Sequence, residues 1–96
     1  MNLENPAFLP SPFSLGQIVV DRFASKKLCP EDIIPALSRH LLGDWGRVDK
    51  RRRDANNKVV NEKQKQSLYS VYFSTDGVKF RVVTNAERSL TTVKVF

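Results

Sequence analysis

The last third of the chain restricts the possible folds more than any other segment, because it consists largely of β-branched and aromatic residues. Three runs, 68–75, 78–84 and 90–96, have the composition of β-strands and are separated by short polar breaks. The first break contains Asp76-Gly77, a dipeptide typical of a two-residue type I′ hairpin turn. We therefore expect three consecutive strands that belong to one antiparallel sheet.

A two-residue loop at Asp76-Gly77 also fixes the expected pairing of the first two strands. It places Phe73 opposite Phe80 and Tyr72 opposite Arg81. Side chains alternate between the two faces of a strand, so the phenylalanines are expected to face the core. The other face, which we expect to be open to a partner, then carries Tyr72, Lys79, Arg81 and Lys94.

Two helices and one further strand precede this sheet in the prediction. Residues 1–14 contain three prolines, and we expect them to form a flexible arm before a single domain that spans 15–96. The run 15–21 predicts a strand, Pro30 to Gly43 has the start and stop signals of a helix, and Asp49 can cap a surface helix that ends near Lys63. The expected fold is α+β in the order β-α-α-β-β-β, with a mainly antiparallel four-stranded sheet and two helices on one face.

The positive charge of the chain is concentrated in one segment. The net charge is +6, and the stretch 47–65 holds eight basic residues against three acidic ones. Such a block favours polyanions or an acidic protein surface, although a solvated helix can have the same composition. Its basic residues are Arg47, Lys50, Arg51, Arg52, Arg53, Lys58, Lys63 and Lys65.

Composition also limits the class of protein. Cys29 is the only cysteine, so we expect a buried structural thiol, no internal disulfide and no structural metal site. The sequence predicts no cofactor, because it has no phosphate-cradling glycine loop. An N-terminal stretch without a basic region followed by an apolar run predicts neither a secretory signal nor a membrane span, which favours a cytoplasmic protein.

His40 and the turn that follows it invite a catalytic interpretation. An adjacent carboxylate such as Asp44 can raise the pKa of a histidine and orient its ring for acid–base chemistry. The structural alternative is that His40 packs at a helix end, with Trp45 as a core anchor for the turn. No serine or threonine lies in a nucleophile elbow, so no residue pattern specifies a reaction.

Three stretches resemble a family of short proteins of unassigned activity that are encoded on plasmids and integrative elements. They are LGQIVV (15–20), RHLLGDWG (39–46) and SVYFSTDGVKFRVVTNAERSLTTV (70–93). The most distinctive parts of the resemblance are His40, the GDWG turn at 43–46, Arg88-Ser89 and Thr91-Thr92. The chain departs from typical members in its basic run after that turn and in Arg81, where they have tryptophan. The resemblance implies a mobile genetic element as the setting.

These observations lead to three hypotheses about function. The first is a non-enzymatic binding protein that engages nucleic acid or a host defence complex through a basic surface. The second is a ribonuclease, because the expected topology resembles the RelE/ParE toxin superfamily, whose sheet face would then carry the chemistry. The third is an assembly subunit that binds only protein, with a homodimer as a further possibility. The expected contact residues are Lys50, Arg51, Arg52, Arg53, Lys58, Tyr72, Lys79, Arg81 and Lys94.

Overall fold

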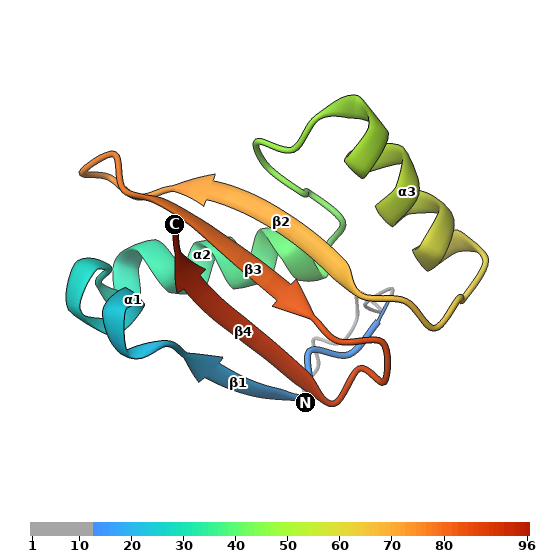
Figure 1. Ribbon diagram of the computed structural model, residues 1–96, viewed down its shortest axis with the longest axis horizontal. Coiled ribbons are helices and arrows are strands. Elements are labelled where there is room, and N and C mark those ends of the chain that lie inside the picture. The colour runs from blue at the N-terminus through green and yellow to red at the C-terminus, as the bar shows by residue number, and fades with distance from the viewer. Residues whose placement is uncertain (1–12) are drawn as a thin grey trace, which may run out of the picture.

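The computed structural model describes residues 13–96 and shows an α+β fold with three helices and four strands (Figure 1). The expected arm at 1–14 therefore lies largely outside the described residues. The elements are β1 (Gln17–Val20), α1 (Arg22–Lys27), α2 (Pro30–Leu41), α3 (Lys50–Asn61), β2 (Leu68–Phe73), β3 (Lys79–Thr84) and β4 (Leu90–Val95).

The sheet is mixed, with the strand order β1-β4-β3-β2. Strands β2, β3 and β4 form the expected antiparallel meander, whereas β1 pairs in parallel with β4. A parallel pair requires a long connection, and here three helices and two strands intervene between the two partners. The antiparallel part of the fold class is thus confirmed, and the position of β1 makes the sheet mixed.

The two expected helices are present, and their ends follow the predicted signals. Pro30 occupies the first turn of α2, and Gly43, with a φ of +83°, follows its end. The Asp49 side chain accepts a hydrogen bond from the Arg52 backbone N–H and so caps α3.

Residues 13–96 contain one helix more than the sequence predicted. The segment expected to be a plain connection forms α1, a single helix of six residues. Asp21 caps its start by accepting from the Phe23 backbone N–H. Only Ala24 of α1 is buried, so this helix has no apolar periodicity that a sequence pattern could reveal.

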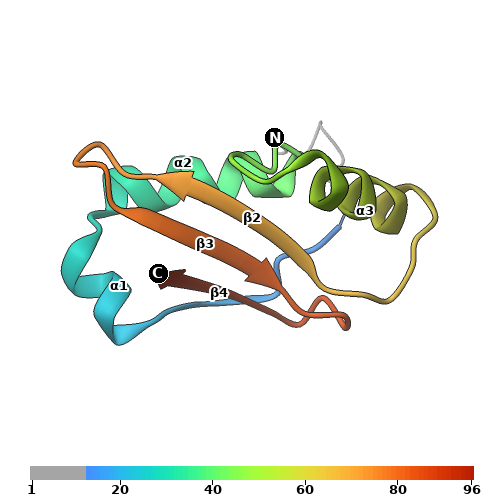
Figure 2. The ribbon, with the colours of Figure 1, turned by 45° about the horizontal axis from the view of Figure 1, so that its top comes forward.

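The helices α1 and α2 contribute to one core on one face of the sheet, which we call the helix face (Figure 2). Ala24 and Ala36 of these helices pack against strand residues such as Phe80, Val82 and Val93. A second, smaller cluster at the β2 edge joins α3 to the sheet and contains Trp45, Val59 and Leu68. The opposite surface of the sheet, the open face, has no helix of residues 13–96 over it (Figures 1 and 2).

The predicted hairpin register is wrong by one residue. Tyr72 pairs with Phe80, and Phe73 pairs with Lys79. The reason is a three-residue loop: the Ser74 N–H donates to the Val78 carbonyl at 2.9 Å, and Gly77 has a φ of +83°. This is a turn followed by a left-handed residue, which adds one residue to the two-residue connection that we expected.

A contact distant in sequence fixes this loop. Asp32 at the start of α2 accepts hydrogen bonds from both the backbone N–H and the hydroxyl of Thr75, each at 2.9 Å. These bonds also lower the pKa of the Asp32 carboxyl. A slip of one residue exchanges the two faces of a strand, so the loop decides which aromatic residues of β2 reach solvent.

Cys29 is exposed, and the expectation of a buried thiol is therefore wrong. It stands at the N-cap of α2, where its Sγ donates to the Asp32 carboxylate at 3.1 Å, and this interaction raises the pKa of the thiol. None of the helices among residues 13–96 has the length and apolar character needed to cross a membrane.

Candidate nucleic-acid interface

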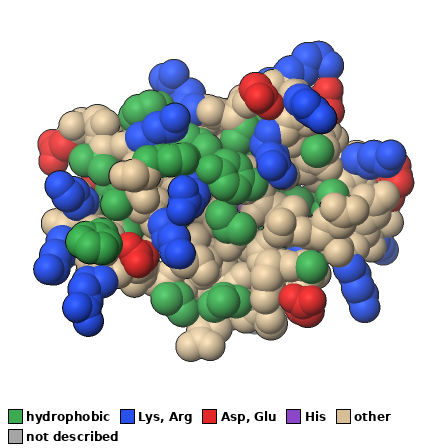
Figure 3. All heavy atoms as spheres, viewed as in Figure 1, with side chains coloured by type: hydrophobic (Ala, Val, Ile, Leu, Met, Phe, Trp, Pro, Cys, Tyr) green, Lys and Arg blue, Asp and Glu red, His purple; other side chains and the backbone are tan. Residues whose placement is uncertain are grey.

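The open face combines exposed aromatic rings with basic side chains. Phe73 and Lys79 are neighbours in the register, and Arg81 stands between Val71 and Lys94 in the next row. Phe73 is 48% exposed, although the sequence prediction placed it in the core. Figure 3 shows an apolar area on this face with lysine and arginine side chains beside it.

Cations lie over both exposed phenylalanine rings of the open face. The Arg47 guanidinium is 5.5 Å from the centre of the Phe73 ring, and the Lys79 Nζ is 4.7 Å from the centre of the Phe96 ring. Arg81 also approaches Phe96, at 5.1 Å. These distances are within the range of cation–π attraction, so the rings and charges form one surface. Phe96 is 58% exposed, and no pattern in the sequence predicts a functional role for it or for Phe73.

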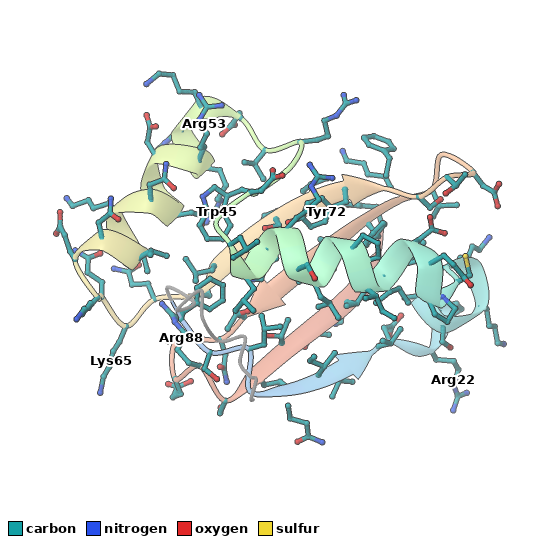
Figure 4. All side chains as sticks on the ribbon, turned by 180° about the vertical axis from the view of Figure 1, so that it is seen from behind. Arg22, Trp45, Arg53, Lys65, Tyr72 and Arg88 are labelled. Carbon is teal, nitrogen blue, oxygen red and sulfur yellow. The ribbon has the colours of Figure 1, made fainter. Side chains whose placement is uncertain are left out.

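Helix α3 extends this basic surface beyond the β2 edge. The Arg52 guanidinium lies 5.2 Å from the centre of the Tyr69 ring, which belongs to β2. The buried Asn56 donates its side-chain amide to the Tyr69 carbonyl at 2.8 Å, and this hydrogen bond attaches the helix to the strand. The remaining basic residues predicted for this helix are also exposed: Lys50, Arg51, Arg53 and Lys58. Figure 4 labels Arg53 on α3.

The turn before α3 places Arg47 beside Phe73. Gly46 forms a parallel bridge with Val71, in which the Arg47 N–H donates to the Val71 carbonyl at 2.7 Å. Gly46 has a φ of +73°, and a Cβ at this position would overlap the Val71 carbonyl oxygen. Only glycine allows this close approach, which also covers the outer edge of β2.

Tyr72 is not part of the open face. It is 2% exposed, its ring packs on the helix face beside Phe80, and its hydroxyl donates to the Asp44 carbonyl at 2.6 Å. Burial raises the pKa of Tyr72 to about 12. The prediction of Tyr72 as a contact residue is therefore wrong, and the register shift brings Phe73 to the surface instead.

His40 has a structural environment rather than that of an acid–base catalyst. Its ring is fully buried, with Nδ1 hydrogen-bonded to the Ser70 hydroxyl and Nε2 2.9 Å from the Thr84 hydroxyl. The Thr84 hydroxyl in turn contacts that of Thr91 at 2.7 Å. Desolvation, followed by the nearby charge of Arg88, lowers the pKa of His40 to about 4.

The carboxylate of Asp44 does not pair with His40. It accepts from the Arg39 guanidinium at 2.8 Å, an exposed ion pair that lowers its pKa. Trp45 is 3% exposed and contacts the His40 ring edge to face, so its interpretation as a core anchor is confirmed. It lies between α2 and α3, and its indole N–H donates to Asn57 at 2.8 Å (Figure 4).

Arg88, in the loop between β3 and β4, connects this loop to the segment that precedes β2. Its guanidinium donates to the carbonyls of Gln66 at 2.7 Å, Asn85 at 2.8 Å and Gln64 at 3.2 Å. Its φ of +60° is unusual for a residue with a side chain, and these bonds hold it there. The motif residues His40, Asp44, Trp45 and Arg88 thus stabilise the fold, and they lie apart from the open face.

Comparison with known proteins finds no match: no family model fits the chain, and no curated protein or solved structure resembles it significantly. Among residues 13–96, no three histidine, cysteine or acidic side chains gather as a metal site would require. The geometry of the open face is therefore the basis for a functional proposal.

Proposed function

We propose that the chain is a non-enzymatic binding protein whose open face takes single-stranded nucleic acid. The observation that supports this proposal is the pair of exposed rings, Phe73 and Phe96, with Arg47, Lys79 and Arg81 beside them. Aromatic rings stack on unpaired bases, and neighbouring cations neutralise the phosphates between them.

A single strand fits this surface better than a duplex does. The bases of a duplex are stacked on each other, so their flat sides cannot reach Phe73 or Phe96. When a base stacks on one of the two rings, it displaces the cation that lies over that ring. The displaced cation is then free to contact a phosphate of the strand. Arg52 and the exposed start of α3 then provide further phosphate contacts beyond the β2 edge.

A binding role is favoured over the ribonuclease hypothesis by the position of Tyr72. The ribonuclease hypothesis needs a tyrosine or a lysine near Arg81 for proton transfer, and the tyrosine that it relied on, Tyr72, is buried with its hydroxyl donating to the Asp44 carbonyl. The resemblance to plasmid and integrative-element proteins suggests a mobile element as the cytoplasmic setting of this binding. A host defence complex that presents a single strand or an acidic patch would bind to the same open face.

Fluorescence anisotropy with a labelled single-stranded oligonucleotide tests the proposal. We expect Phe73→Ala to weaken binding by roughly 5- to 150-fold, which corresponds to the loss of one stacked base. Ile34→Ala is the matched control, because Ile34 is 62% exposed on α2, away from the open face. Binding should also weaken steeply with salt, and Lys79→Ala should reduce the salt slope by about 1.

Two results would contradict the proposal. One is an affinity that does not change with salt, because phosphate contacts release counterions when they form. The other is an equal loss of affinity in Phe73→Ala and Ile34→Ala, since a surface away from the open face should not contribute.

A further inference from the structure

Strand β1 has an edge that no described residue pairs with. It lies at the margin of the sheet, on the side opposite α3 (Figure 1). The Gln17 backbone N–H donates to the carbonyl of Ser89, just before β4, and the Asp21 N–H donates to that of Val93 in β4. Backbone groups alternate in direction along a strand, so the N–H and C=O groups of Ile18 and Val20 point away from β4.

The side chains around this edge are apolar and exposed. Ile18 is 44% exposed, Val19 is 41% exposed, and Phe23 at the start of α1 is 64% exposed. Soluble proteins usually protect an edge strand by keeping it very short or with lysine, proline or a bulge. With four residues β1 is short, but Gln17-Ile18-Val19-Val20 contains no lysine, proline or bulge, so its apolar edge remains open to pairing with another short strand.

We propose that this edge pairs with β1 of a second copy of the chain, antiparallel and centred on Val19. In that register Ile18 of each copy faces Val20 of the other, and the outward backbone groups form two reciprocal pairs of hydrogen bonds. Gln17 faces Asp21 of the second copy on the same side of the sheet, so an amide donor meets a carboxylate. The edge is thus complementary to itself in backbone, apolar and polar groups.

The two-fold axis of such a pair is perpendicular to the sheet. Both sets of helices then lie on one side, and the two open faces form one continuous surface on the other side. A contact limited to one short strand is far smaller than the roughly 800 Å² per partner that a stable interface buries. The dimer is therefore reversible and depends on protein concentration. This inference does not rest on the proposed nucleic-acid binding.

Sedimentation equilibrium from low-micromolar to near-millimolar protein tests the inference. The wild-type protein should shift from monomer to dimer. Ile18→Pro removes an outward N–H without removing a bond to β4, and Val19→Lys places two charges together at the axis. Each variant should raise the dimer dissociation constant at least tenfold, whereas Ile34→Lys should not. Monomers at every wild-type concentration, or a dimer that both β1 variants retain, would overturn it.

Disulfide trapping gives a second test that does not depend on weakened folding. A central antiparallel pair without hydrogen bonds brings its Cα atoms to about 4.5 Å, which a disulfide can span. In a Cys29→Ser background, Val19→Cys should oxidise rapidly to a covalent dimer, whereas Ile34→Cys should remain largely monomeric. Equal crosslinking of the two cysteine variants would refute the proposed register.

Discussion

Replacement of Gly46 by alanine tests the role of the GDWG turn in the architecture. A Cβ at this position would overlap the Val71 carbonyl oxygen and lie 2.7 Å from Cδ1 of the Tyr72 ring. Neither neighbour can move easily, because Val71 belongs to the sheet and Tyr72 is buried. We expect the turn to separate from β2.

The cost has two parts. A left-handed backbone costs alanine about 1–2 kcal/mol relative to glycine. Separation of the turn also breaks the bonds from the Arg47 N–H to the Val71 carbonyl and from the Val71 N–H to the Trp45 carbonyl. Two such bonds contribute about 2 kcal/mol together, so Gly46→Ala should lower the free energy of unfolding by about 3–4 kcal/mol.

Gly77→Ala is the matched control for this prediction. Gly77 has a similar φ of +83°, but a Cβ there would meet no atom within 4 Å. It should therefore lose only the backbone part of the free energy. Urea denaturation should separate the two variants by about 2 kcal/mol, equivalent to melting temperatures about 8–16 °C apart. Equal losses would refute the argument that close approach, rather than backbone conformation alone, makes Gly46 necessary.

Two further predictions concern buried groups on the helix face. The pKa of His40 is about 4 in the folded chain against 6.5 ordinarily, so in that pH range only the unfolded chain binds the proton. The free energy of unfolding should therefore fall by about 3 kcal/mol as the pH drops from 6.5 to about 4. Urea denaturation at several pH values should show that this free energy depends less steeply on pH in His40→Gln than in the wild type. The same pH dependence in both proteins would contradict the prediction. Tyr72→Phe should lower the free energy of unfolding by about 1 kcal/mol, because it removes the hydrogen bond to the Asp44 carbonyl. The same variant should leave nucleic-acid affinity unchanged, and weaker binding would indicate that Tyr72 reaches the ligand.

Local signals in the sequence were sufficient to predict most of the elements. Pro30 and Asp49 begin helices where proline and capping rules place them, and the β-branched runs form strands. Helix α1 was missed because its six residues bury only Ala24. The parallel pairing of β1 with β4 depends on tertiary contacts across most of the chain, which no local pattern encodes.

The hairpin shows why the candidate site was predicted only in part. Thr75 of the three-residue loop donates two hydrogen bonds to Asp32 of a helix distant in sequence, and that contact cannot be inferred from the loop sequence. The one-residue difference buried Tyr72 and exposed Phe73. Lys79, Arg81 and Lys94 keep their expected side of the sheet, because the residues that alternate with them, Phe80, Val82 and Val93, face the core as predicted.

Chemical-shift mapping by NMR tests the central claim most directly. An unlabelled single-stranded oligonucleotide would be titrated into isotope-labelled protein at low salt, with the amide shifts followed for residues 13–96. The proposal predicts that the largest changes cluster on the open face, at Phe73, Lys79, Arg81 and Lys94, and extend to the start of α3. Changes confined to the exposed surface of α2, or none with oligonucleotide in excess, would contradict it.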